Sequence, residues 1–159
     1  MTTDKNALAP SFLLLASLAL ALPVVAQPPS EGGGRITVSL SSLEGADGTI
    51  LCGLFRESDA EGFPMSRRDA WKSARRAASA ARDARMTLVF DEVPAGRYAV
   101  SCMHDEDDDG AMDTGIFGIP KEGWAVSRNA SPSMRAPRFD EAVVEYDGGA
   151  TTLRLRMQY

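Results

Sequence analysis

Apolar and polar residues alternate in short segments from about residue 35 to the end of the chain. The first two segments are ITVSLSSL (36–43) and TILCGLF (49–55), and a turn-forming stretch with Gly45 and Gly48 separates them. Because a period of two places every second side chain on the same face, each segment predicts a half-buried β-strand. Together they predict a hairpin with a short loop.

Four more segments of this kind follow, each bounded by Gly, Pro or Asp: MTLVFDEV (86–93), RYAVSCM (97–103), AVVEY (142–146) and TTLRLRM (151–157). Six short strands without long helices between them predict an all-β fold, an antiparallel β-sandwich. Between two of these strands, Pro94 and Gly96 suit a type I turn. Tyr98 resembles the corner tyrosine of β-sandwiches, whose hydroxyl bonds to nearby backbone.

One segment departs from this pattern. Residues 66–85 (SRRDAWKSARRAASAARDAR) are rich in Ala and Arg, which favours a short helical insertion between strands. Four of its apolar residues share one helical face: Trp71, Ala74, Ala78 and Ala81. The opposite face is basic and carries Arg68, Lys72, Arg75, Arg76 and Arg82. We expect this face to be solvated, and contact with an acidic polymer or an anionic lipid surface is the alternative.

The N-terminal region has the order of a cleavable signal peptide. Lys5 lies in a polar start, Phe12 to Leu22 is an apolar run, and small residues end at Ala26. We therefore expect residues 1–26 to be removed after Ala26. A transmembrane anchor is disfavoured because the apolar run is much shorter than the roughly 20 residues that span a bilayer. The sequence predicts a periplasmic or secreted protein without a transmembrane anchor after signal cleavage.

Residues 27–34 (QPPSEGGG) are polar and rich in Pro and Gly, so they predict a flexible linker, and the domain is expected to span 35–159. The hydrophobic fraction of 44% and the charged fraction of 25% are typical of one soluble globular domain. The formal net charge of −5 disfavours nucleic acid as a partner.

The two cysteines lie in predicted core strands. Cys52 is in TILCGLF and Cys102 is in RYAVSCM. In an oxidising compartment such a pair is expected to form a disulfide, and two buried free thiols are the alternative. Neither cysteine lies in a CxxC motif or near the start of a helix, which argues against a catalytic cysteine.

The stretch HDEDDDGAMD (104–113) contains the pattern DxDxDGxxD, which is formed by Asp105, Asp107, Asp109, Gly110 and Asp113. Alternate carboxylates followed by Gly let a loop wrap a hard cation, with the carbonyl of Ala111 as a further oxygen ligand. The pattern predicts a short Ca²⁺ loop and not an EF-hand, because Ile116 stands where an EF-hand requires Glu. A solvated acidic turn, or pairing with the basic segment, is the alternative.

His104 is the only histidine and its neighbours are carboxylates, which argues against a hydrolytic triad or a zinc enzyme. We therefore expect no enzymatic activity and interpret His104 as a hydrogen-bonding residue beside the loop. Phe117, Trp124 and Phe139 are candidates, together with His104, for a ligand-binding surface near the acidic loop. The alternative is a satellite core under a long loop.

Several pieces of the chain occur in an order that is similar to a known family: VPAGRYAV (93–100), HDEDDDGAMDTGIFGIPKEGWAVS (104–127), PRFDEAVV (137–144) and LRLRMQY (153–159). They resemble the DUF2141 family of bacterial exported proteins. The resemblance implies an exported β-sandwich related to immunoglobulin-like and prealbumin-like folds, and it names no substrate. Members usually show Asn where this chain has Asp107 or Asp109, so the loop here is more negative.

Two classes of function follow from these features. The first is an exported, non-enzymatic module whose calcium-organised loop helps to present a surface to a protein or glycan partner. The second is a structural or accessory subunit of a cell-envelope complex, in which the loop serves the stability of the fold alone.

Overall fold

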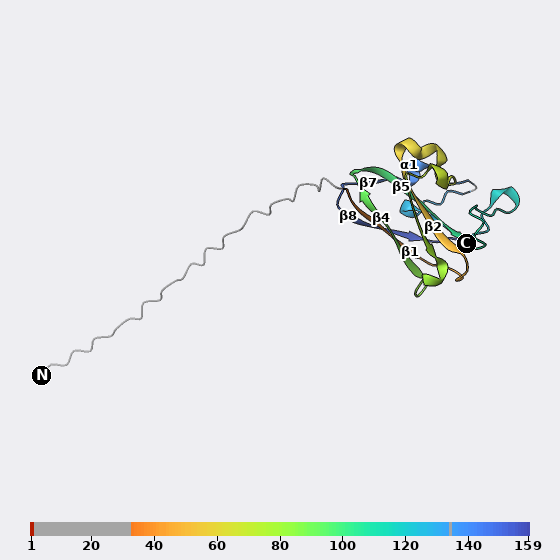
Figure 1. Ribbon diagram of the computed structural model, residues 1–159. Coiled ribbons are helices and arrows are strands. Elements are labelled where there is room, and N and C mark those ends of the chain that lie inside the picture. Colours follow the sequence, from red (N-terminus) through yellow and green to blue (C-terminus); the bar gives the residue numbers. More distant parts are fainter. Residues whose placement is uncertain (2–32, 134) are drawn as a thin grey trace.

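The structure is a computed structural model that describes residue 1 and residues 33–133 and 135–159. The predicted signal peptide (1–26) and the predicted linker (27–34) lie outside these residues, apart from Met1 and the last two linker positions. The described chain forms two β-sheets that pack face to face (Figure 1). The prediction of an all-β sandwich is confirmed.

The three-stranded sheet has the order β4–β1–β8, with β4 at Arg85–Val93, β1 at Gly34–Ser41 and β8 at Ala150–Arg156. β1 is central; it runs antiparallel to β4 and parallel to β8. Ile36, Val38 and Leu40 of β1 are fully buried, whereas the residues between them face outward. The alternation in the sequence therefore places the correct face of this strand in the core.

The five-stranded sheet contains β3 (Lys72–Ala77), β2 (Thr49–Arg56), β5 (Gly96–Asp105) and β6 (Trp124–Val126) in this order. β7 (Val144–Tyr146) and β6 pair with the same edge of β5. β7 pairs with its first residues, Gly96–Tyr98, and β6 pairs with its later residues, Ser101–Met103. All pairs in this sheet are antiparallel.

The predicted hairpin of the first two strands is wrong, because β1 and β2 lie in different sheets. Each is a central strand whose two edges are occupied by other strands, β4 and β8 for β1, and β3 and β5 for β2. The connection crosses between the sheets with positive φ at Ser42, Gly45 and Gly48. Alternation shows which face of a strand is buried, but it does not identify the partner strand.

The segment 66–85 contains short 3₁₀ helices, η2 (Arg67–Asp69) and η3 (Ala78–Ala80), but the chain between them is the strand β3. The predicted continuous helical face from Trp71 to Ala81 is therefore not formed. Pairing with β2 satisfies the backbone of β3, and this outweighs the helical preference of Ala and Arg, which amounts to tenths of a kcal/mol per residue. Trp71 instead stacks on Tyr98, with the ring centroids 5.8 Å apart.

Two groups of apolar side chains flank the five-stranded sheet. The main core lies between the sheets and includes Ile36, Val38, Leu40, Ile50, Leu54, Leu88, Phe90, Val100 and Leu155. The second cluster, on the other side of the five-stranded sheet, consists of Phe55, Phe63, Ala99, Val126, Phe139 and Ala142. Short helices that cover this second side are η1 (Glu57–Gly62), η5 (Ser127–Asn129) and α1 (Phe139–Ala142).

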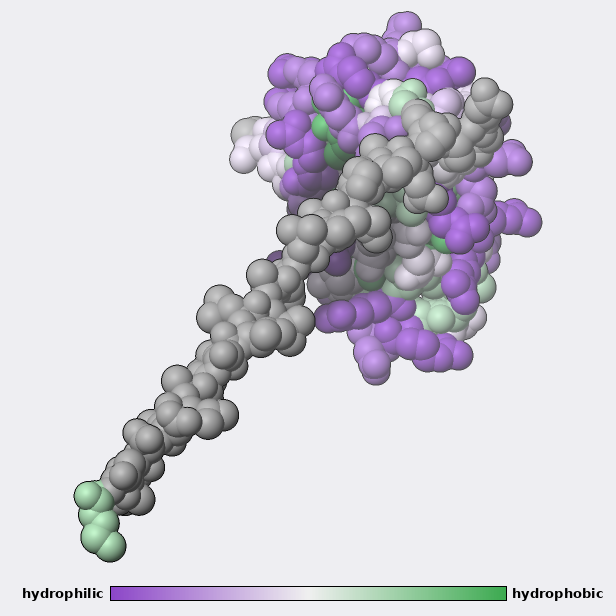
Figure 2. Space-filling view, turned by 90° about the vertical axis from the view of Figure 1, so that its left-hand side faces the viewer, coloured by the Kyte–Doolittle hydropathy of each residue, from purple (hydrophilic) through white to green (hydrophobic). Residues whose placement is uncertain are grey.

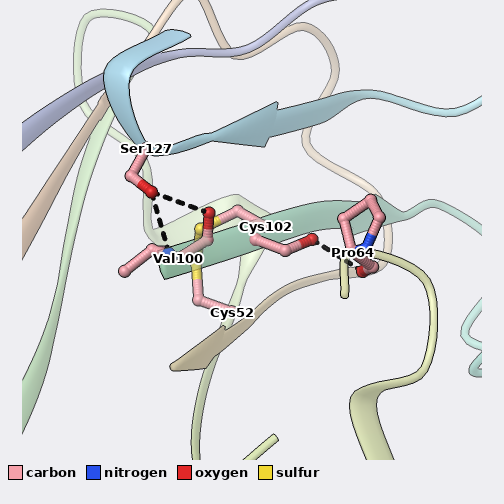
Figure 3. The surroundings of a disulfide bond; sticks show 6 residues. Cys52, Pro64, Val100, Cys102 and Ser127 are labelled. Atoms are coloured by element: carbon pink, nitrogen blue, oxygen red, sulfur yellow. Dashed lines mark hydrogen bonds between the residues drawn. A yellow bond between two sulfur atoms is a disulfide. The ribbon is translucent and has the colours of Figure 1, made fainter. Parts of the chain in front are cut away.

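The predicted disulfide between Cys52 and Cys102 is confirmed (Figure 3). The two residues are directly opposite each other on β2 and β5, and both are buried. Next to the disulfide, the hydroxyl of Ser127 accepts a hydrogen bond from the N–H of Val100 at 2.9 Å. The Ser127 hydroxyl donates to the carbonyl of Ala142 at 2.6 Å, which ties the end of α1 to β5.

The corner between β4 and β5 is closed as the sequence predicts. The hydroxyl of Tyr98 donates to the carbonyl of Pro94 at 3.0 Å. None of the described helices has the length and apolar character needed to cross a membrane. On the side of the molecule shown in Figure 2, hydrophilic residues predominate and hydrophobic ones form small separate patches.

Candidate metal site

The acidic loop, defined here as residues 106–113, follows the last residue of β5 and projects from the sandwich near the C-terminus (Figure 1). Gly48, with φ +69°, lies against the base of this loop. A Cβ at Gly48 would overlap the carbonyl oxygen of Asp105, so only glycine fits this contact. The connection between β1 and β2 therefore fixes the backbone position of Asp105.

Three of the predicted ligands converge. Asp105, Asp107 and Asp109 each place one carboxylate oxygen within 4.8 Å of the others. Within the loop, the N–H of Asp109 donates to Oδ1 of Asp107 at 3.2 Å, and the N–H of Ala111 donates to Oδ1 of Asp109 at 2.6 Å. Gly110 has φ +81°, which permits the sharp turn that the sequence pattern predicts.

Asp105 is the buried member of this group, with 3% of its surface exposed. Its Oδ2 accepts a hydrogen bond from the N–H of Gly110 at 3.1 Å. Its Oδ1 is buried and has no hydrogen-bond donor among the described residues. Burial raises the pKa of the Asp105 carboxyl, and the negative charges of Glu122 and Asp108 add to this rise. A buried carboxylate oxygen without a donor raises the free energy of the fold unless a cation or proton binds it.

A second buried carboxylate, Glu122, holds the two ends of the loop together. Its Oε1 accepts a hydrogen bond from the N–H of Glu106, and its Oε2 accepts one from the N–H of Asp113, both at 2.9 Å. Both carboxylate oxygens of Glu122 thus have protein donors, and the side chain is 5% exposed. Glu122 therefore sets the width of the loop at its base.

No Lys or Arg forms an ion pair with the acidic loop in the part of the chain that the structure describes. Arg67, in η2, approaches the loop, where its guanidinium donates to the carbonyl of Gly110 and lies 3.0 Å from the sulfur of Met103. The basic segment thus contacts the loop through a backbone carbonyl. Among the described residues, the carboxylates of the loop have no Lys or Arg side chain paired with them.

The other two predicted ligands are Asp113 and the carbonyl of Ala111. The carboxylate of Asp113 is not in the group of converging oxygens, and its N–H is the donor to Glu122. Ala111 directs its N–H towards Asp109. Three of the four predicted carboxylates therefore converge, and a cation at this site would complete its coordination with further oxygens such as those of water.

His104 is buried and precedes the loop. Its Nε2 is 2.8 Å from the carbonyl oxygen of Asp47, and its Nδ1 is 2.9 Å from the hydroxyl of Tyr159. A carbonyl can only accept, so Nε2 carries a proton. The Tyr159 hydroxyl also accepts from the N–H of Glu44 at 3.0 Å. His104 therefore fastens the end of β5 to two other segments, in keeping with its interpretation as a hydrogen-bonding residue.

Two of the three aromatic residues predicted for a ligand surface, Phe139 and Trp124, lie at the second cluster. Phe139 is buried in the second cluster, where its ring centroid is 6.0 Å from that of Phe63. Trp124 is partly buried and packs against the same cluster. Phe117 lies in η4 (Ile116–Gly118), and its side chain is outside the described part of the structure. Phe139 and Trp124 thus occupy the satellite core that was the alternative interpretation.

The family model for an uncharacterized protein conserved in bacteria (DUF2141) matches residues 38–154. The chain belongs to this family. The matched region extends from β1 into β8 and includes the acidic loop and Glu122. No curated protein and no solved structure matches the chain.

The sequence did not identify Glu122 as a neighbour of the loop, and it offered the basic segment 66–85 as a partner without singling out Arg67. Glu122 lies within the GIPKEGWAVS stretch of this DUF2141 protein, the only acidic residue between Thr114 and Ser127. Its position as a single carboxylate in a segment between Gly118 and Gly123 was the feature of the sequence that could have indicated a role. No feature of the sequence distinguishes Arg67, because it is one of many arginines in the segment 66–85.

Proposed function

We propose that this protein is an exported, non-enzymatic β-sandwich module whose acidic loop binds calcium and which presents a surface to a protein or glycan partner. The observation that carries the calcium proposal is the buried Oδ1 of Asp105, which has no donor among the described residues, on a carboxylate that converges with those of Asp107 and Asp109. A cation there would supply the missing electrostatic partner and reduce the repulsion among the carboxylates.

The type of ligand supports calcium over other metals. The group offers only carboxylate oxygens, which suit hard cations, whereas zinc prefers His and Cys. Magnesium demands nearly ideal octahedral geometry and gives up its waters reluctantly, so a loop with two exposed carboxylates favours calcium. Without a bidentate Glu at the last position, we expect an affinity in the weak range of extracellular calcium modules.

Export and the lack of enzymatic activity have separate support. A buried disulfide is typical of proteins that mature in an oxidising compartment, in agreement with the predicted signal peptide. Both ring nitrogens of His104, the only histidine, are engaged by Asp47 and Tyr159. This side chain is therefore not available as a general base for a nucleophile.

Thermal unfolding in EDTA and in calcium tests the metal site. Calcium at about 100 times its Kd should stabilise the native state by roughly 2.7 kcal/mol and raise Tm on the order of 10 °C. Asp105→Asn should abolish this rise, because it removes the buried charge. Asp108→Asn is the matched control, because it removes one negative charge at a residue outside the converging group. Asp108 has φ +60°, a backbone conformation that Asn tolerates. Equal Tm of the wild type in EDTA and in calcium, with no heat of binding by calorimetry, would refute the proposal.

The second candidate, a structural subunit in which the loop only stabilises the fold, is favoured by the way Glu122 ties the loop to itself at both ends. Glycan arrays and pull-downs in calcium and in EDTA separate the two candidates. Calcium-dependent retention of a ligand supports the first, and calcium stabilisation without any retained ligand supports the second.

A further inference from the structure

The outer face of the three-stranded sheet has arginines on both sides of its central strand. The strand register places Arg156 of β8, Ser41 of β1 and Arg85 of β4 in one row, and Arg154 beside Ser39 in a neighbouring row. These residues alternate with buried ones along their strands, so their side chains point away from the core. Short hydroxyl side chains on β1 thus lie between the longer side chains of arginines on both flanking strands, and this set of residues is here called the arginine trough.

The guanidinium groups of the arginine trough are free of acidic partners. Among the described residues, Arg85, Arg154 and Arg156 form no ion pair, whereas Arg35 at the other end of β1 pairs with Asp91 at 2.6 Å. All three are exposed on a protein of net charge −5. Neighbouring rows are only about 7 Å apart along a strand, so these like charges repel one another. A bound polyanion would remove that repulsion.

We propose that the arginine trough binds an acidic polysaccharide. Guanidinium groups bind carboxylate or sulfate through paired hydrogen bonds, and the hydroxyls of Ser39 and Thr37 can exchange hydrogen bonds with sugar hydroxyls. Arg85 on one flanking strand, and Arg154 and Arg156 on the other, can therefore reach charged groups on either side of an extended chain that lies along β1. The site lies on the sheet that does not carry the acidic loop, and its chemistry does not require calcium.

The same face argues against a membrane or a nucleic acid as the partner. Val89 is the one large hydrophobic residue that the three strands expose there, at 39%, which is too little apolar surface for insertion into a lipid bilayer. The outward positions of β1, β4 and β8 carry no aromatic residue on which bases could stack. Hydroxyl groups between guanidinium groups are better matched to a charged sugar chain.

Titration with hexagalacturonate, a uronic acid oligomer, tests this proposal in low salt with EDTA. We expect amide NMR shifts confined to β1, β4 and β8, and an affinity that falls as salt is added. The double variant Arg154→Ala, Arg156→Ala should weaken binding at least tenfold, because each lost charged hydrogen bond is worth about 1.5 kcal/mol or more. Arg154→Lys with Arg156→Lys should give an intermediate loss, since charge remains without the paired geometry.

Arg75→Ala is the matched control, because Arg75 is an exposed arginine on the other sheet. It should change the affinity less than about twofold, as expected for a screened distant charge. The double variant should keep the calcium-induced rise in Tm, so loss of either site is distinguishable from loss of the other. Absence of binding, an equal loss in Arg75→Ala, or equal binding of neutral cellohexaose or of oligothymidylate through the same residues would overturn the proposal.

Discussion

Asp105 and Glu122 are two buried carboxylates at the base of one loop, yet their hydrogen-bonding situations are opposite. Glu122 receives N–H donors on both oxygens, from Glu106 and Asp113. Asp105 receives one donor and keeps a buried oxygen without any among the described residues. The protein therefore satisfies both carboxylate oxygens of Glu122 by itself, whereas one oxygen of Asp105 has no protein donor, and under our calcium proposal a cation would bind it. In that proposal Glu122 positions the loop and Asp105 binds the cation.

Glu122→Gln should weaken calcium binding by about tenfold to a hundredfold, the range typical of residues that hold metal ligands in place. The amide NH₂ of Gln cannot accept a hydrogen bond, so one of the two N–H groups at the ends of the loop loses its acceptor. Calcium affinity by calorimetry and amide hydrogen exchange at Glu106 and Asp113 should both respond. An unchanged affinity together with faster exchange would show that the width of the loop base does not matter for the metal.

Glu141 provides a pH-dependent contact away from the loop. The guanidinium of Arg135 donates to it at 2.6 Å, and the N–H of Arg138 donates at 2.9 Å, so its pKa falls from 4.5 to about 2. Because the folded pKa is lower than the unfolded one, this contact stabilises the fold above about pH 4.5. Its contribution is lost as the pH falls towards 2.

A carboxyl ¹³C titration of Glu141 should therefore have its midpoint near pH 2 in the folded protein. Arg135→Ala should raise that midpoint towards the ordinary value, because Arg135 is the principal cause of the shift. A midpoint near pH 4.5 in the wild type would contradict the contact with Arg135.

At the scale of elements, the open side of the sandwich between β3 and β4 is closed by side chains. β3 and β4 are edge strands of different sheets. Lys72 donates to the carbonyl of Asp91 at 2.7 Å, and Arg76 donates to the carbonyl of Thr87 at 3.3 Å. Long basic side chains thus occupy acceptors on an edge that would otherwise be open to strand pairing with another molecule.

Arg76→Ala should lower the free energy of unfolding by about 0.5–1 kcal/mol, through loss of the bond to Thr87, and should promote dimerisation at high concentration. Arg75→Ala should change neither quantity, because Arg75 points to the opposite face of β3 and has no bond to β4. Urea unfolding and sedimentation measure the two effects. Equal behaviour of the two variants would contradict the proposed closure of the edge.

Strand positions could be predicted from the sequence because alternation reports burial directly, as Ile36, Val38 and Leu40 illustrate. The partner of each strand could not be predicted from the sequence, because it depends on which strand edges are free once all strands are assembled. β1 and β2 illustrate this, since they were expected to pair and lie in different sheets. The strand at 72–77 was hidden for a related reason. Its Ala and Arg residues favour a helix locally, and only the free edge of β2 makes a strand more stable there.

At the scale of the whole molecule, β5 connects the base of the acidic loop to the main core. It carries Cys102 in the main core, and it ends at His104 and Asp105. The DxDxDGxxD spacing predicted the convergence of Asp105, Asp107 and Asp109, because these residues are close in sequence, but it also predicted Asp113, whose carboxylate lies outside the group. Glu122 could not be predicted as their neighbour, since it approaches through the pairing of β6 with β5, a contact between distant segments.

The disulfide between Cys52 and Cys102 should be a principal source of stability. It links positions 50 residues apart, and the chain-entropy model assigns such a closure about 4 kcal/mol, a large share of the roughly 5–15 kcal/mol typical of a domain. Urea unfolding of the oxidised and the reduced wild type measures this difference while keeping both sulfur atoms in the core. Because the bond acts mainly on the unfolded chain, the reduced protein, where still folded, should bind calcium with unchanged affinity. A lower affinity on reduction would instead show that the bond shapes β5 up to Asp105 in the native state.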